Sequence, residues 1–530
     1  MKLQLIIPMS GIGQRFKNAG YSIPKFLIKV KEKEIINHVV NMFEEIENII
    51  FICNENHLQD LNLNLKEILY SLHPKIQIVS IAQHKKGPIH AVLEAENYFN
   101  LSCPTIVNYC DFNSIFSNSR FLSFLNFDNP DGCVFTYTGF HPHMLKNTNY
   151  AYVKKRGNSV IDIQEKKPFT EDPTSEEVSS GTYFFKSAEL MIKYFKKTVS
   201  LDLNVKGEYY VSMAYKPMID DGLKINTFLI DYFMQWGTPS DLEEFNWYKS
   251  IFDKLSKSKK NSRRKNKGCL LMPMAGNGSR FIKKGYKIPK PFIKVSGEEM
   301  YLKAIKDLPK METIKIVTRE DIIEKRNKKL NIRDTSFKVN TKILKNVTEG
   351  QACTCLKAME DNDINLEREL IISACDMGII YDLDKYKKSL SSKDVDILVW
   401  GCKGFPGAIR SPNMYSWIYN EGKYISNISV KNNLNNPKED NVLIGTFTFK
   451  KAKFFLESAK ISVSDGKKIN GEYYVDDVIN YSIKLGLKVA LFQVEYFVCW
   501  GTPEELETFK YWESCFEKWK DFSSNNKTIN

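Results

Sequence analysis

The chain has 530 residues, which is long enough for at least two hydrophobic cores. Hydrophobic residues make up 43% and charged residues 26%, as in ordinary soluble globular proteins, and no apolar run is long enough to cross a bilayer. The apolar run after Met1 leads directly into a glycine-rich turn and is too short for a secretory signal, so we expect a cytoplasmic protein without a membrane span.

The net charge of +13 is concentrated in one segment. Residues 251–268 carry eight basic side chains against one acid, Asp253, and so contribute +7 of that charge. We interpret this segment as a solvated linker. The alternative, contact with RNA or an anionic membrane, is disfavoured, so nucleic acid is not an expected partner.

Cysteine and histidine are distributed in ways that limit the chemistry. The eleven cysteines include no Cys-x-x-Cys pair, so we expect buried, reduced thiols. All seven histidines lie in the first half of the chain, the last being His143. A mechanism common to both halves therefore cannot depend on histidine.

Strand and helix patterns alternate along the chain. Apolar runs in the first half predict strands, and helical spacing predicts helices between them. The expected strands are 3–7, 48–53, 76–81 and 105–109, and the expected helices are 35–45, 61–72 and 87–99. The second half repeats this order with strands at 269–272 and 370–373 and a helix at 350–359. The alternation favours a doubly wound, mainly parallel sheet, whose ligands gather at the carboxyl ends of the strands.

The first half is repeated in the second. Segment 8–25 recurs at 273–290 with a constant offset of 265. Two later matches have an offset of 264, namely 206–211 with 470–475 and 236–239 with 500–503. The duplication predicts an N-terminal domain at 1–250, the basic linker at 251–268, a C-terminal domain at 269–515 and a polar tail at 516–530.

A glycine-rich turn follows the first predicted strand of each half. Gly11 and Gly13 would let backbone N–H groups approach an anion closely, and Arg15 could form bidentate bonds to phosphate. Lys25 adds a compact cation behind a stiff proline. The turn matches neither a dinucleotide fingerprint nor a P-loop, and a structural strand–helix turn explains the glycines alone nearly as well. The recurrence of Lys25 as Lys290 in the same setting favours a phosphate site.

Two acids follow apolar strands at equivalent positions. Asp111 and Asp376 could each cap a turn, but a Mg²⁺ bridging phosphates needs one or two carboxylates, so we expect them to be metal ligands. Asp231 and Glu495 are weaker candidates for a second ligand. An interpretation as core-edge or surface acids fits these two equally well.

Together, Gly-x-Gly-x-Arg-Phe, the distant Pro-Lys, the Asp-ending strand, Gly-Glu-Tyr-Tyr and Trp-Gly-Thr-Pro resemble the sugar-phosphate nucleotidyltransferase family, including its capsule and surface-polysaccharide cytidylyltransferase-like branch. The likeness covers nearly the whole chain apart from the linker and tail. It implies two tandem GT-A-like (Rossmann-like) α/β domains, each a mainly parallel mixed sheet flanked by helices. It also implies Mg²⁺-dependent transfer from a nucleoside triphosphate to a sugar phosphate or small phosphate ester, with release of pyrophosphate.

The resemblance assigns roles residue by residue. Arg15, Lys25, Arg280 and Lys290 would be catalytic. The nucleotide would be held by Met9, Ser10, Gly11, Gly13 and Gly87, and in the second half by Met274, Ala275, Gly276, Gly278 and Gly350. The acceptor would be bound by Glu165, Lys166 and Gly181, and in the second half by Lys431 and Gly445. The expected partners are thus a triphosphate, with CTP modestly favoured, and a phosphorylated small molecule; a homo-oligomer is compatible with the sequence.

Some positions depart from the family pattern. Gln235 and Cys499 stand where many members carry a second metal-binding Asp, and Val430 replaces the acid of Glu165-Lys166. The nucleotide ends of the halves agree while the acceptor ends differ. This leaves open two sites with different acceptors, or one catalytic half and one that senses nucleotide or pairs subunits. A GT-A glycosyltransferase is the rival enzyme, although neither strand-end Asp has a second acid two residues later.

Overall fold

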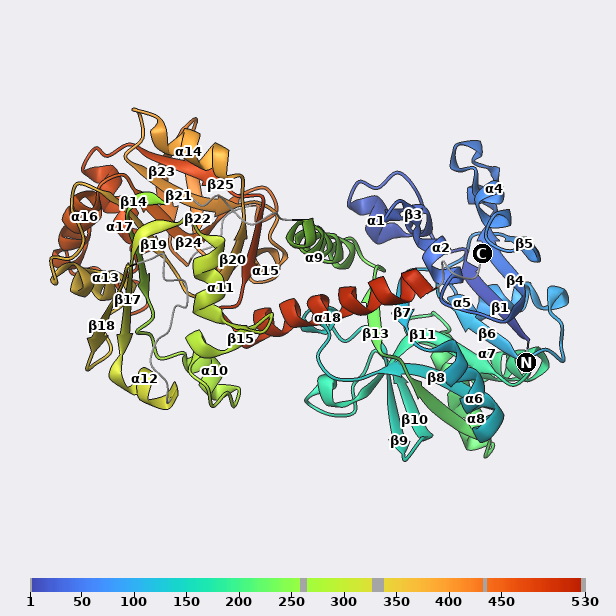
Figure 1. Ribbon diagram of the computed structural model, residues 1–530. Helices are drawn as coiled ribbons and strands as arrows, with labels where there is room; N and C mark the ends of the chain where they lie inside the picture. The colour runs from blue at the N-terminus through green and yellow to red at the C-terminus, as the bar shows by residue number, and fades with distance from the viewer. Residues whose placement is uncertain (1, 258–264, 327–337, 432–435, 526–530) are drawn as a thin grey trace. The chain divides into compact units, whose positions relative to one another are not determined.

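The computed structural model describes residues 2–257, 265–326, 338–431 and 436–525 (Figure 1). The chain forms two compact units. Residues up to Asn246, together with the chain from Ser514 on, form the first, and Trp247–Glu513 form the second. Among the described residues, no helix combines the length and apolar character needed to span a membrane.

Each unit is built on a nine-stranded mixed sheet. The first has the order β5-β4-β1-β6-β11-β8-β12-β10-β9, with β1, β4, β5 and β6 parallel and β11 antiparallel to both neighbours. Its strands are β1 (Leu3–Met9), β4 (Ile46–Asn54), β5 (Ile76–Ile81), β6 (Thr105–Asn108), β8 (Gly132–Tyr137), β9 (Ala151–Arg156), β10 (Ser159–Glu165), β11 (Glu177–Phe185) and β12 (Ile225–Leu229). Short pairs are formed by β2 (Lys29–Val30) with β3 (Lys33–Glu34) and by β7 (Phe112–Ile115) with β13 (Tyr232–Gln235). Its helices are α1 (Gln14–Asn18), α2 (Ile35–Val40), α3 (Glu55–Gln59), α4 (Leu65–Tyr70), α5 (Pro88–Glu94), α6 (Asn118–Asp128), α7 (Ala188–Ser200), α8 (Tyr215–Asp220) and the start of α9 (Pro239–Lys257).

The second sheet has the same topology, β18-β17-β14-β19-β24-β21-β25-β23-β22. Its strands are β14 (Asn266–Pro273), β17 (Met311–Arg319), β18 (Lys338–Leu344), β19 (Glu369–Ser373), β21 (Ile397–Cys402), β22 (Trp417–Glu421), β23 (Tyr424–Ser429), β24 (Asn441–Phe449) and β25 (Val489–Gln493). The short pairs are β15 (Lys294–Val295) with β16 (Glu298–Glu299) and β20 (Met377–Ile380) with β26 (Tyr496–Cys499). Its helices are α10 (Ser279–Lys283), α11 (Met300–Asp307), α12 (Glu320–Arg326), α13 (Gln351–Met359), α14 (Leu383–Ser391), α15 (Pro406–Arg410), α16 (Ala452–Ser464), α17 (Val475–Lys484) and the first part of α18 (Pro503–Asn525), whose end from Ser514 belongs to the first unit.

Hydrophobic layers cover both faces of the second sheet. Along β14, Leu270 and Met272 belong to one buried cluster, while Cys269 and Leu271 belong to another, because successive strand residues point to opposite faces. Helices α13, α16 and α17 supply the second cluster and α11 the first, and Figure 1 shows them on opposite sides of the sheet. This is the helix–sheet–helix sandwich that the alternating pattern predicts.

The long helices correct two expected boundaries. Helix α9 continues through Lys257, so the first part of the expected linker is helical, and α18 continues through Asn525 into the expected polar tail. The reason is an apolar stripe at helical spacing, which makes a long amphipathic helix despite a polar composition. In the tail, Phe516 and Trp519 are buried, and both pack on Phe245 of the first unit. Linker residues 258–264 lie outside the described residues.

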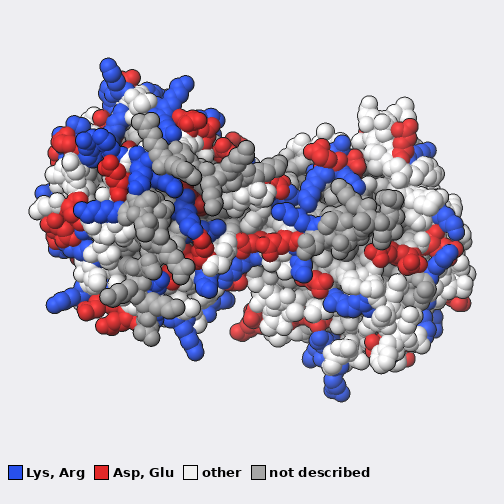
Figure 2. All heavy atoms as spheres, viewed as in Figure 1, with Lys and Arg blue, Asp and Glu red and all other residues white. Residues whose placement is uncertain are grey.

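The cysteines are free, as predicted, and charges of both signs are mixed on the visible face. All eleven cysteines are free and most are buried. On the face shown in Figure 2, the described Lys and Arg side chains are interspersed with Asp and Glu over both units. That arrangement is typical of a solvated surface rather than of a groove for nucleic acid.

Candidate active site

The first unit contains a cavity of about 540 Å³ next to the carboxyl ends of its central strands. Eleven of the twelve site residues predicted for this half line it, the exception being Asp231. These are Met9, Ser10, Gly11, Gly13, Arg15, Lys25, Gly87, Asp111, Glu165, Lys166 and Gly181. The parallel strands β1 and β6 meet at one sheet edge, which is why the turn after Met9 and the acid after β6 share one cavity.

The glycine turn has an open side. Gly13 has a left-handed backbone (φ 67°), as does Gly278 (φ 62°), a conformation that glycine adopts without strain. A Cβ built on Gly11 or Gly13 would meet nothing within 4 Å, so the space beside the turn is available to a ligand. Gly87 differs, because a Cβ there would lie 2.7 Å from the backbone nitrogen of Tyr209. Its small size lets the Gly-Glu-Tyr-Tyr loop close over the start of α5.

A lysine and an aspartate form an ion pair inside the cavity. Lys25 follows Pro24 in a single 3₁₀ turn, and its Nζ lies 2.6 Å from Oδ2 of Asp111. Burial lowers the pKa of Lys25, but the charge and hydrogen bond of Asp111 together with the neighbouring Cys110 oppose it, and the net pKa is raised. Lys25 is therefore charged near neutral pH and forms an ion pair with Asp111. A bound triphosphate could take Lys25 as its ionic partner, and a bound cation could take Asp111.

The second unit contains the same pair. Nζ of Lys290 lies 2.5 Å from Oδ2 of Asp376. Burial would raise the pKa of Asp376, yet the neighbouring Lys290 lowers it overall. The offset of 265 thus reproduces a three-dimensional contact and not only a string of residue types.

The structure does not place Asp231 or Glu495 beside these pairs. Strand β13 pairs antiparallel with β7, so that Gln235 faces Phe112 while Tyr232 faces Ile115. At about 3.3 Å per residue, Asp231 is roughly 13 Å farther along the ladder from Asp111 than Gln235 is. Its carboxylate pairs instead with Arg120 on α6. In the second unit, β26 pairs antiparallel with β20 so that Tyr496 faces Ile380 and Cys499 faces Met377. Glu495 therefore also lies at the far end of the ladder from Asp376, and it forms an ion pair with Lys254.

Gln235 occupies the place that was expected for a second ligand. A Cβ on Gly237 would lie 2.7 Å from Oδ2 of Asp111 and 3.4 Å from Oε1 of Gln235, so both oxygens face this glycine. In the second unit, the corresponding atoms around Gly501 are Oδ2 of Asp376 and Sγ of Cys499. The first unit therefore offers two oxygen donors, and the second offers one oxygen and a sulfur.

Glu165 and Lys166, the residues predicted to bind the acceptor, line the cavity. Glu165 ends β10 and accepts a 2.7 Å hydrogen bond from Oγ of Ser212. Burial raises its pKa, although the Ser212 hydrogen bond and Lys166 oppose the shift. Lys166 has a left-handed backbone (φ 61°), and so does Lys431 (φ 53°). Such a conformation is uncommon for a non-glycine residue and is retained where the surrounding structure requires it.

Several cavity residues had no role assigned from the sequence. Nζ of Lys166 hydrogen-bonds the hydroxyl of Tyr210, and that hydroxyl donates to Glu208. Burial lowers the pKa of Lys166, against the opposing charges of Glu165 and Glu208. The repeated Gly-Glu-Tyr-Tyr motif was the available signal for Glu208 and Tyr210. Other lining residues carried no such signal: His84, Lys85, Asn147, Asn149 and Tyr150.

The acceptor end of the first unit also has an aromatic wall. The Tyr137 hydroxyl and Nε2 of His143 lie 2.8 Å apart. Burial lowers the pKa of His141 to about 4 and that of His143 well below its usual range, so both rings are neutral at physiological pH. Behind the cavity residue Tyr150, which His143 contacts edge-on, they act as packing groups.

In the second unit, a different residue holds the glycine turn. Arg319, at the end of β17, donates to the carbonyl of Ala275 and to Oδ1 of Asn277 while Asp321 holds its other nitrogens. Met274 is buried and its N–H donates to Val317. Arg280, Gly276 and Gly278 lie in or next to the exposed part of the turn, and Gly350 approaches the backbone of Tyr473 as Gly87 approaches Tyr209. Gly445 has the left-handed backbone of its counterpart Gly181.

The comparisons with known proteins agree with this geometry. The family described as Nucleotidyl transferase matches residues 5–246. Curated relatives include the bifunctional protein GlmU of Clostridioides difficile (strain 630), 26% identical over 236 residues that cover 43% of this chain and 47% of the relative. GlmU of Methanococcus maripaludis is 24% identical over 249 residues, covering 46% of this chain and 54% of the relative. The chain thus spans about half the length of the curated relatives it matches.

Solved structures also align with single halves of the chain. The UTP-bound UGPase of Acinetobacter baumannii has 19% identity and a TM-score of 0.38, covering 49% of this chain and 99% of that one. The inositol-1-phosphate CTP transferase of T. maritima has 15% identity and a TM-score of 0.36, with coverages of 47% and 97%. The fold of the protein is two tandem nucleotidyltransferase-like α/β domains. The family match and the curated relatives each correspond to less than half of this chain.

Proposed function

We propose that the protein is a nucleotidyltransferase that joins a nucleoside triphosphate to a sugar phosphate or another small phosphate ester and releases pyrophosphate. The observation that carries the proposal is the Lys–Asp pair beside the glycine turn, at 2.6 Å in one unit and 2.5 Å in the other. From the family resemblance, the proposal includes CTP as the favoured nucleotide, a cytoplasmic setting and a role in precursor synthesis for capsule or surface polysaccharide.

The reaction is an in-line attack of an acceptor phosphate oxygen on the α-phosphorus. A bond forms between that oxygen and the α-phosphorus, the α–β bridging bond breaks, and pyrophosphate leaves with the electron pair. Both reactants are anions, so positioning and charge neutralisation supply most of the catalysis. A phosphate nucleophile is already ionised and needs no general base, which fits a second half without histidine.

The cavity residues divide this work. Lys25 would leave Asp111 and bind the α-phosphate, where negative charge increases in the transition state. Arg15, whose charge is close enough to act on the pKa of both Lys25 and Lys166, would offset charge on the leaving pyrophosphate. Lys166 would bind the acceptor phosphate, and the buried Glu165 would accept hydrogen bonds from acceptor hydroxyls. Arg280, Lys290 and Lys431 would take the corresponding places in the second unit.

The donor atoms fit a magnesium ion in the first unit. Mg²⁺ prefers oxygen ligands and is usually held by one or two carboxylates together with substrate phosphates. Asp111 would hold it, with Gln235 supplying an amide oxygen beside it. In the second unit Asp376 would hold it alone, because burial, with the charges of Glu505 and Asp376, raises the pKa of Cys499 to about 12 and keeps the thiol neutral. Bound Mg²⁺ would neutralise charge on the triphosphate oxygens.

The test is a screen of the full chain for pyrophosphate release. Each of the four triphosphates is combined with a panel of sugar, polyol and aminoalkyl phosphates, with and without Mg²⁺. We expect release only when an acceptor and Mg²⁺ are both present. Sugar transfer from a nucleotide-sugar without pyrophosphate release would instead identify a glycosyltransferase and overturn the proposal.

A further inference from the structure

The acceptor sides of the two units contain the same kind of contact built from different residues. In the first unit the acid is Glu165, at the end of a strand, and its hydroxyl partner is Ser212, in a 3₁₀ turn. Across the hairpin, Glu165 pairs with Ala151, which also lines the cavity. The unit therefore has an acid on the strand, a hydroxyl on the helical segment and a methyl group on the neighbouring strand.

In the second unit all three residue types have changed. The position of Glu165 holds Val430, that of Ser212 holds Asp476, and that of Ala151 holds Ser416. Oγ of Ser416 donates to Oδ2 of Asp476 at 2.6 Å. The acid is now on α17 and the hydroxyl is next to the hairpin, so donor and acceptor have exchanged elements.

The surroundings of this contact match those of its counterpart. Lys431 keeps the left-handed backbone of Lys166, and its N–H donates to Oγ of Ser416 at 3.4 Å. Ser416 and Asp476 are only 2% and 8% exposed. Burying a carboxylate is unfavourable unless it is hydrogen-bonded. A buried acid that appears in the one unit that lost the strand acid indicates compensation rather than decay.

We propose that Asp476 is the acceptor-binding carboxylate of the second unit, in place of Glu165, and that this unit takes a phosphorylated acceptor bearing hydroxyl groups, a sugar or polyol phosphate. This inference rests on the proposed function. Lys431 binds the phosphate, and Asp476 accepts hydrogen bonds from the hydroxyls. Because the carboxylate comes from the helix and not from the strand, the two units select acceptors with different arrangements of hydroxyl groups.

The test uses the full chain carrying Lys25→Ala, Arg15→Ala and Lys166→Ala, which removes the cations proposed to hold the triphosphate and the acceptor phosphate in the first unit, so that binding reports on the second unit. Calorimetry first measures binding of α,β-methylene-CTP and of its uridine, adenosine and guanosine analogues, which bind without turnover. With the tightest analogue bound, inorganic phosphate and a panel of sugar and polyol phosphates are titrated. Failure of all four analogues to bind would refute the proposed function for this unit. Nucleotide binding without binding of any panel ester would overturn only the assignment of Asp476.

The variant Asp476→Asn keeps the shape of the side chain and its contact with Ser416. We expect it to weaken ester binding by roughly 10- to 100-fold, as for loss of a hydrogen bond to a charged group, with nucleotide and inorganic phosphate binding unchanged. The matched control, Asp477→Asn, removes the same charge one residue along, where the side chain contacts Asn480. Equal ester affinities in the Asp476 variant and its parent would overturn the proposal.

A second variant guards against a merely structural effect. The triple change Val430→Glu, Ser416→Ala and Asp476→Ser copies the first unit's arrangement into the second. We expect it to bind panel esters, with the order of preference moved toward that of the first unit, which is measured in a chain carrying Lys290→Ala, Arg280→Ala and Lys431→Ala. An order of preference identical to that of the unmodified second unit would contradict the role of Asp476.

Discussion

The two units share the Lys–Asp pair beside the glycine turn, whereas several buried polar contacts differ between them. The glycine turn, the lysine and the strand-end aspartate have the same sequence offset and the same contact in both units. The contacts of Glu165 and Asp476, and the packing of β17, differ from those of the other unit. On the proposed function, a triphosphate would present the same charges to both units, so the residues around it would tolerate little change. A buried polar group needs only a hydrogen-bonding or ionic partner, so different residues can form such a contact in the two units.

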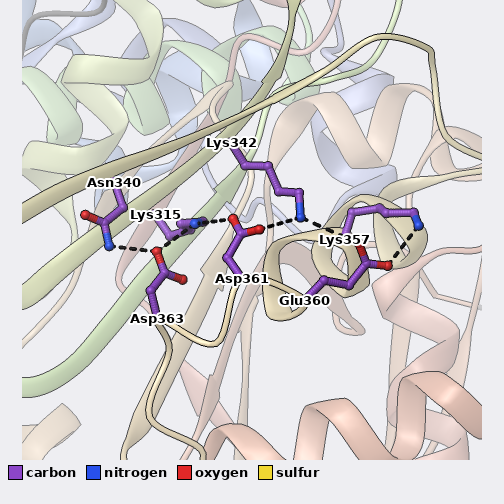
Figure 3. A network of polar contacts seen from close by, with 7 residues as sticks. All are labelled: Lys315, Asn340, Lys342, Lys357, Glu360, Asp361 and Asp363. Atoms are coloured by element: carbon purple, nitrogen blue, oxygen red, sulfur yellow. Dashed lines mark hydrogen bonds and ion pairs between the residues drawn. The ribbon is translucent and has the colours of Figure 1, made fainter.

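Strand β17 of the second sheet shows how such rebuilding works. At the position of the fully buried Ile50, the second unit has Lys315, whose side chain is 3% exposed. Its Nζ lies 2.7 Å from both Asp361 and Asp363, within a network that also contains Lys342 (Figure 3). Burial lowers the pKa of Lys315, but the two aspartates raise it overall, so the amine stays charged. The second unit thus replaces apolar packing with a fully paired cation.

The largest expected effect breaks the part that the units share. We expect Lys25→Ala to lower the rate of one activity about 10²- to 10³-fold, since it removes one charge that stabilises the transition state. Lys290→Ala should do the same to the other activity. Pyrophosphate release measured with each unit's acceptor checks this. Full release in the double variant would show that neither lysine is catalytic.

A difference in pH dependence sharpens the comparison. Burial raises the pKa of Glu369 to about 7, while its hydrogen bond from Tyr386 opposes the shift. The first unit has Pro104 and Phe121 at these positions. Because the folded second unit holds this proton more tightly, the contribution of Glu369 to stability should be fully present below about pH 4.5 and be lost as the pH rises through 7, by an amount on the order of 3 kcal/mol.

Calorimetric unfolding between pH 4.5 and 8 measures this difference. The variant Glu369→Gln should remove the fall in the transition assigned to the second unit and leave the other transition unchanged. A variant that keeps the parent's slope would contradict the assignment to Glu369.

The buried lysine network predicts a smaller effect on stability. Asp363→Ala leaves Lys315 with one aspartate and should lower the free energy of unfolding by about 1–2 kcal/mol, less than for a fully buried pair because Asp363 is partly exposed. Lys315→Ile copies the first unit and should cost less, because it removes the buried charge itself and the two aspartates left behind are partly exposed to water. Urea denaturation compares the two variants, and the reverse order would refute this account.

The smallest effect concerns the support of the turn. Arg319→Asn copies Asn54, whose Nδ2 makes a single 3.2 Å hydrogen bond to the carbonyl of Ser10. The turn of the second unit should loosen, raising the nucleotide KM a few-fold with kcat unchanged, as when a bond made equally in ground and transition states is lost. Steady-state kinetics with the second unit's acceptor, with the first unit's activity as internal control, would show it. An unchanged KM would mean that Asp321 and Asn277 hold the turn without the arginine.

Much of the fold could be predicted because its signals are local. Apolar runs and helical spacing located the strands and most helices, although the expected helix at 61–72 divides into a 3₁₀ turn at Leu61–Leu63 and α4. Residues 516–525 of the expected polar tail instead form the end of helix α18. Its polar composition concealed Phe516 and Trp519, whose spacing marks the buried stripe of a long helix.

The sequence by itself determined the duplication, the strand–turn cradle and the lysine that accompanies it, because backbone freedom at glycine, fixed charge and apolar periodicity are properties of neighbouring residues. Only the tertiary structure decided which oxygen lies beside Asp111 and which acid is hydrogen-bonded to a serine in each unit. The register of β13 on β7 brings Gln235 to that place and carries Asp231 away. The meeting of a hairpin with a helical segment pairs Glu165 with Ser212 in one unit and Asp476 with Ser416 in the other. Contacts between distant elements depend on register and packing, which no local pattern encodes.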